Sequence, residues 1–109
     1  MATNPRTLCI ATLAERRIEE ITAWYEDAWD KGYYNEDPSD DFYWTIMDKF
    51  DYLLKFNEAG PEVPGKGGVR RLVITGRFEY YAFYRLTETE VIILAVTKDY
   101  DPKLDESEV

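Results

Sequence analysis

The sequence predicts an α+β domain in which two helices cover one face of a four-stranded, mostly antiparallel sheet, in the order β-α-α-β-β-β. In the first half, apolar residues recur at steps of three and four in two stretches, which is typical of amphipathic helices. After a glycine- and proline-rich segment at 58–68, the apolar period falls to two, as in strands. With 109 residues we expect one domain over 1–109, with its core at about 6–98 and an acidic tail at 99–109.

The first strand is expected at 6–12, and a helix follows it at once. Thr12 and Glu15 have the spacing of a capping box, in which the threonine hydroxyl accepts from the Glu15 amide. The stripe that this helix is expected to bury consists of Ala14, Ile18, Ile21, Tyr25 and Ala28. Gly32 supplies the left-handed residue at which the helix is expected to end.

The second helix is expected at about 39–57, after a turn-rich acidic connection. Asp40 and Asp41 fall in its first turn, where negative charge favours the helix dipole. Its stripe consists of Phe42, Ile46, Phe50, Leu53 and Asn57. Because the segment between the two helices is short and polar, we expect them to form an antiparallel hairpin.

Three strands are expected at 69–75, 78–86 and 91–96, joined by tight turns. The last strand is apolar on both faces, which places it inside the sheet rather than at an edge. Alternate residues of the middle strand face the helices, and the others face away. Since two helices cover one face only, we expect the other face to be open. The residues expected to be displayed there are Arg77, Tyr81, Phe83 and Arg85.

Composition excludes several classes of function. Thirteen Lys and Arg against 22 Asp and Glu give a net charge of −9, which excludes direct binding of free nucleic acid and disfavours a membrane surface. The chain has no His, so His-dependent triads, dyads and zinc sites are excluded. Cys9 is the only cysteine, so neither an intrachain disulfide nor a thiolate cluster is expected.

We therefore expect a cytoplasmic protein without a metal ion or another cofactor. A single unpaired cysteine fits a reducing compartment, and no apolar run approaches the ~20 residues of a membrane helix. The acidic cluster at 36–41 lacks the glycine and terminal glutamate of a calcium loop, and is best explained as a solvated connection.

The charge is unevenly distributed along the chain. Residues 1–57 carry six bases and twelve acids, whereas 66–85 carry five bases and one acid, Glu79. The five bases are Lys66, Arg70, Arg71, Arg77 and Arg85. Two interpretations stay open: ordinary solvated side chains paired with nearby acids, or a patch that recognises anions through bidentate arginine contacts.

The chain resembles the RelE/ParE superfamily of toxins from type II toxin–antitoxin systems over about 7–102. The segments that carry the resemblance are LAER at 13–16, GVRRLVI at 68–74, FYRL at 83–86 and VIILAV at 91–96. The resemblance implies a toxin neutralised by a cognate antitoxin, as a homodimer or as a heterotetramer with that antitoxin. RelE-like members cleave mRNA on the ribosome, whereas ParE-like members inhibit DNA gyrase by binding.

The ParE-like alternative leads, because it needs a binding surface rather than a reactive centre. Its candidate partner-binding residues are Arg70, Arg71, Arg77, Tyr81, Phe83 and Arg85, with Trp24 and Trp29 beside the stripe of the first helix, where an antitoxin helix would fit. In the RelE-like alternative, the charge stabilisers are Lys66, Arg71, Arg77, Lys98 and Tyr100. A third alternative is a non-toxic or designed protein-binding module on the same scaffold.

Overall fold

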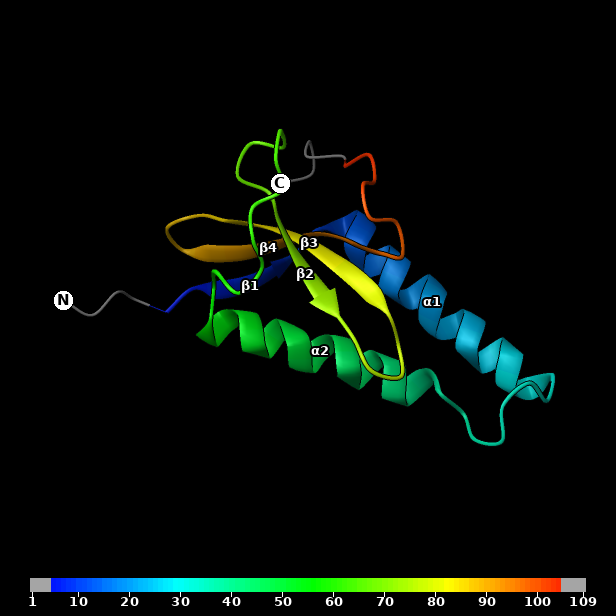
Figure 1. Cartoon of the computed structure of the whole chain (residues 1–109). Coiled ribbons are helices and arrows are strands. Elements are labelled where there is room, and N and C mark those ends of the chain that lie inside the picture. The colour runs from blue at the N-terminus through cyan, green and yellow to red at the C-terminus, as the bar shows by residue number, and fades with distance from the viewer. Residues whose placement is uncertain (1–4, 105–109) are drawn as a thin grey trace.

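The computed structural model describes residues 5–104 and has the predicted α+β architecture (Figure 1). Two helices pack against a four-stranded sheet, and the element order is β-α-α-β-β-β. The elements are β1 (Thr7–Ile10), α1 (Thr12–Asp30), α2 (Ser39–Lys55), β2 (Arg70–Ile74), β3 (Tyr80–Leu86) and β4 (Glu90–Thr97).

The strands are ordered β1-β4-β3-β2, so β4 lies inside the sheet as its two apolar faces predict. β1 runs parallel to β4, whereas β2, β3 and β4 are antiparallel neighbours. Between β3 and β4 the register shifts, because Phe83 pairs with Ala95 and Tyr84 with Ile93. Leu94 is the extra residue of this bulge.

The main core lies between the helices and one face of the sheet (Figure 1). All five residues predicted for the stripe of α1 are buried, and so are four of the five predicted for α2, Asn57 being half-buried. The sheet residues that meet them are Leu72, Ile74, Tyr80, Ala82, Tyr84, Val91, Ile93 and Val96. The hydroxyls of Tyr25 and Tyr80 lie 3.2 Å apart inside this layer, so each gives the other a polar partner.

The predicted capping box does not form. The N-cap of α1 is Ala11, which makes no side-chain cap hydrogen bond, and the Glu15 amide donates instead to the Ala11 carbonyl at 2.9 Å. The Ala11 amide donates to the Ile93 carbonyl of β4. Ala11 is therefore hydrogen-bonded to the sheet through its amide and to the first turn of α1 through its carbonyl. The chain therefore enters α1 at Thr12 itself. Gly32 adopts the expected left-handed conformation, with φ of 82°.

The expectation of an open second face is wrong. The loop between α2 and β2 and the segment that follows β4 both fold over this face (Figure 1). A second apolar cluster lies beneath them, made of Val63, Val69, Phe83, Ile92 and Leu94, with Leu104 packed against it. Part of the predicted acidic tail, 99–104, thus lies against the sheet. Its remainder, 105–109, lies outside the described residues.

Candidate protein-binding surfaces

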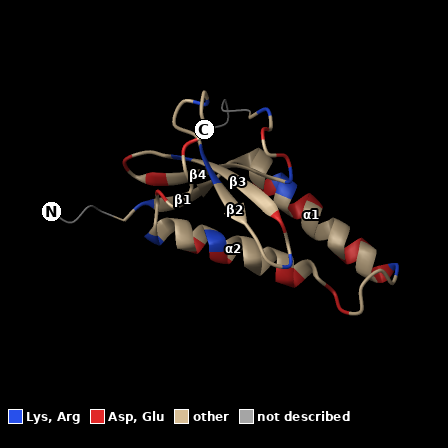
Figure 2. Cartoon of the chain, in the orientation of Figure 1, with Lys and Arg blue, Asp and Glu red and all other residues tan. Residues whose placement is uncertain are grey.

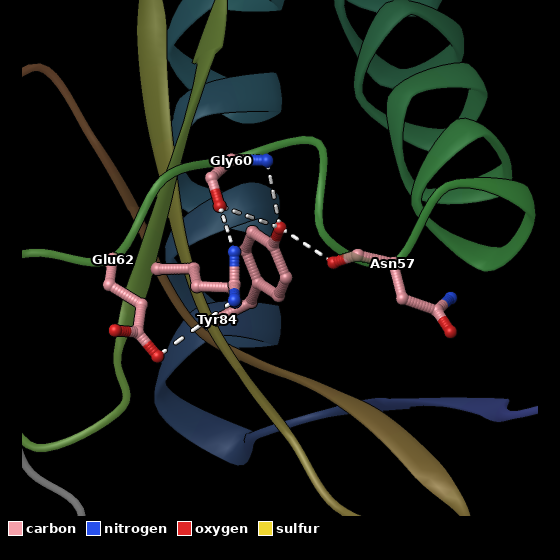
Figure 3. A network of polar contacts seen from close by, with 5 residues as sticks. Asn57, Gly60, Glu62 and Tyr84 are labelled. Atoms are coloured by element: carbon pink, nitrogen blue, oxygen red, sulfur yellow. Dashed lines mark hydrogen bonds and ion pairs between the residues drawn. The ribbon is translucent and has the colours of Figure 1, made fainter.

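A buried tyrosine fixes the loop that covers the second face (Figure 3). The Tyr84 hydroxyl donates to the Asn57 carbonyl at 2.8 Å and accepts from the Gly60 amide at 2.9 Å. Burial raises the pKa of Tyr84, so the phenol keeps its proton and can donate. A β-carbon on Gly60 would lie 2.6 Å from the Arg71 carbonyl oxygen, so only glycine fits this contact.

Arg70 belongs to the same network rather than to the outer surface. Its guanidinium donates to the Gly60 carbonyl at 2.8 Å and lies 3.8 Å from the Glu62 carboxylate. Only 17% of its side chain is exposed. An isolated bridge between Glu62 and Arg70 brings the loop alongside the start of β2. Arg70 therefore holds the loop in place and presents little charge to a partner.

Arg71 lies in contact with the segment after β4, which we call the strap and define as residues 98–104. The Arg71 guanidinium lies 3.7 Å from the ring centre of Tyr100 and donates to its hydroxyl at 2.5 Å. Tyr81, half-buried on β3, meets the Tyr100 ring edge-on at 5.5 Å between ring centres. Two of the predicted partner-binding residues thus contact a residue of the chain itself.

Two further bases lie along this face. The Lys66 ammonium is 3.2 Å from the Asp101 carboxylate and donates to the Pro102 carbonyl at 3.4 Å. Arg85 donates to the Gly67 carbonyl at 3.3 Å. Figure 2 shows basic residues at the start of β2, while acids lie along both helices. Lys66, Arg70, Arg71 and Arg85 therefore lie near the strap or the loop at 58–68, and two of them pair there with acids, Lys66 with Asp101 and Arg70 with Glu62.

The structure separates other residues that the sequence groups together. Phe83 is 0% exposed and belongs to the second cluster, so it is not a surface residue. Arg77 lies in the turn between β2 and β3 and forms an ion pair of 2.5 Å with Asp41 at the start of α2. Lys98 lies over the Tyr80 ring, 5.2 Å from its centre. Among the RelE-like candidates, only Lys66, Arg71 and Tyr100 come together.

The helices carry a second surface, made of aromatic side chains. Trp24 and Trp29 on α1 are 58% and 41% exposed, and Trp44 on α2 is 61% exposed. Trp24 borders a hollow of about 340 Å³ that is also lined by Arg17, Tyr80 and Lys98. Trp44 is absent from the predicted binding residues. Its position, two residues from both Phe42 and Ile46 of the buried stripe, puts it on the outer side of α2.

No protein-family model matches the chain, and a search of curated proteins finds no relative. Within residues 5–104, no group of three or more His, Cys, Asp and Glu side chains is placed to hold a metal ion. Neither of the described helices is long and apolar enough to span a membrane. Assignment of a function therefore depends on the surfaces described above.

Proposed function

We propose that this protein acts by binding other proteins, as a ParE-like toxin neutralised by an antitoxin, with DNA gyrase or a similar enzyme as its target. The observation that carries the proposal is the exposure of all three tryptophans of the chain, at 41–61% of each residue. Tryptophan is among the residues most enriched at the energetic centres of protein interfaces. Its large apolar ring is costly to leave in water without a partner.

The surroundings of the tryptophans support a protein partner. Trp24 lies beside a hollow lined by Arg17, Glu20 and Lys98, and Arg17 pairs with Glu20 at 3.4 Å, so the apolar anchor stands among charges of both signs. An amphipathic helix of a partner, laid along α1, would cover the ring and bring its polar side chains to Arg17, Glu20 and Lys98. The element order and the layering of two helices on a mixed sheet are those that the resemblance to RelE/ParE toxins implies.

Regulated expression in a bacterial host tests toxicity, and supercoiling by purified DNA gyrase tests the target. We expect growth arrest and inhibition of supercoiling. The double variant Trp24→Ala/Trp29→Ala should raise the concentration for half-inhibition at least about tenfold, as expected when interface anchors are removed. Tyr33→Ala is the matched control, since Tyr33 is exposed and lies in the connection between the helices.

Healthy growth together with uninhibited gyrase would contradict the proposal and favour a non-toxic binding module on this scaffold. Inhibition that is unchanged in the double variant would place the binding surface elsewhere. Circular dichroism of each variant distinguishes lost binding from lost folding.

One observation favours the RelE-like ribonuclease as a second candidate. Arg71 and Tyr100 are in direct contact, and Lys66 pairs with the residue after Tyr100. Cations so placed would stabilise charge that develops on a cleaved phosphodiester. Under this candidate, purified ribosomes with the protein should yield cut mRNA, and Arg71→Ala should abolish the cuts while Tyr33→Ala leaves them. Intact mRNA would remove this candidate.

A further inference from the structure

The strap is held to the second face by three different anchors. The Tyr100 ring stacks on the Arg71 guanidinium, and the Asp101 carboxylate pairs with the Lys66 ammonium. Leu104 packs against the apolar cluster formed by the loop, β3 and β4. The strap thus places an aromatic ring on one cation and an acid on a second. The apolar residue three positions after the acid lies on the apolar cluster.

The strap is attached weakly enough to be replaced. It belongs to no strand among the described residues, and its hydrogen bonds to Lys66 and Arg71 come from side chains rather than a strand ladder. Tyr100 is 58% exposed and the Asp101 side chain 73% exposed. Ion pairs at such exposure contribute little to stability. A hollow of about 390 Å³ adjoins Leu104, between Gly65 and Val69, and leaves room for a bulkier occupant.

We propose that this face is a peptide-binding site, and that the strap occupies it in the free protein as an internal ligand. The external ligand is an extended segment of another protein with an aromatic residue, an acid after it and an apolar residue three positions further on. Positive charge from Lys66, Arg71 and Arg85 selects acidic segments and repels basic ones. The three anchoring residues Tyr100, Asp101 and Leu104 do not line the hollow beside Trp24, and the inference does not depend on toxicity.

The test uses the full chain with a loosened strap, Asp101→Lys/Leu104→Ala. The probe is a fluorescein-labelled synthetic peptide with the sequence of residues 98–104, KDYDPKL. In fluorescence anisotropy, we expect the loosened variant to bind the peptide at least about tenfold more tightly than the unaltered chain, because the internal competitor is gone. Tyr33→Ala in the unaltered background should bind as weakly as the unaltered chain.

Two further arms locate the peptide on this face. Adding Arg71→Ala to the loosened variant should remove its gain in affinity for the peptide. A peptide with lysine in place of its second aspartate should not bind the loosened variant. Equal affinity of the loosened and unaltered chains would overturn the proposal. So would tighter binding of a single-stranded RNA oligonucleotide than of the peptide, since the cations would then serve a phosphate ligand. If circular dichroism shows that the loosened variant is unfolded, Tyr100→Ala replaces it with the same expected outcomes.

Discussion

Tyr84 and Gly60, 24 residues apart in the chain, are joined by a hydrogen bond of 2.9 Å from the glycine amide to the tyrosine hydroxyl. The Tyr84 ring belongs to the core beneath the helices, whereas Gly60 opens the loop that covers the opposite face of the sheet. One side chain therefore connects the two layers, and the covering loop depends on it.

Tyr84→Phe should lower the free energy of unfolding by about 1–3 kcal/mol, because it leaves the Gly60 amide without its buried hydrogen-bond acceptor. Urea denaturation followed by circular dichroism measures the change. Tyr52→Phe is the control, since Tyr52 is exposed and its variant should stay within about 0.5 kcal/mol of the original chain. Equal stability of the two variants would contradict the role given to Tyr84.

Stability should fall at alkaline pH because burial raises the pKa of two tyrosines, Tyr80 and Tyr84. Burial raises the pKa of Tyr80, with a contribution from its hydrogen bond to Tyr25, and burial also raises the pKa of Tyr84. Unfolded tyrosines ionise near pH ~10. The unfolded chain therefore loses protons first as the pH rises above ~10, so the stabilisation is complete below that pH and declines above it. Denaturation midpoints from pH ~8 to ~11 measure the slope, and Tyr80→Phe should flatten it.

Gly60→Ala should be more damaging than Gly65→Ala in the same loop. The new β-carbon at Gly60 would lie 2.6 Å from a backbone oxygen and 2.9 Å from the Tyr84 ring, at a cost of about 3 kcal/mol. Gly65 has open space but a φ of +77°, which costs an L-residue about 1–2 kcal/mol. Thermal or urea unfolding of both variants decides the order, and the reverse order would contradict the close approach at Gly60.

Phe83→Ala should cost about 3–5 kcal/mol, because the ring is fully buried in the second cluster. Tyr81→Ala, two residues earlier on the same face, should cost less, since Tyr81 is only half-buried. Comparison of the two unfolding free energies tests whether the second face is truly covered. A Phe83→Ala variant as stable as the original would mean that this ring lies on an open surface.

Arg70→Ala and Arg77→Ala should lower the free energy of unfolding by different amounts, although both residues are arginines of the basic segment at 66–85. Arg70 is 17% exposed and donates to the Gly60 carbonyl, so its loss should cost about 1.5–3 kcal/mol. Arg77 is 49% exposed and pairs with Asp41, which is 60% exposed, so its loss should cost about 0.2–1 kcal/mol. The stability of each variant is measured by urea denaturation. An equal loss of stability in the two variants would contradict the half-buried position of Arg70 and the exposed position of Arg77.

The order of the elements and the main core follow from periodicity in the sequence. The stripe of α1 is buried at every predicted position, and β4 lies inside the sheet because its residues are apolar on both faces. The start of α1 differs from the local pattern: Thr12 and Glu15 fit a capping box, yet Ala11 is the N-cap, and its amide donates to the Ile93 carbonyl of β4. A long-range contact there overrides a local preference.

Periodicity is a property of neighbours in the chain, so the amino-acid pattern alone predicts which residues form helices and strands and which faces of them are apolar. The covering of the second face, the burial of Phe83 and the different partners of Arg70 and Arg77 arise only when the chain folds. The loop and the strap have no regular repeat of apolar residues from which their positions follow. Their positions are set by contacts between residues far apart in the chain, such as Gly60 with Tyr84 and Arg71 with Tyr100.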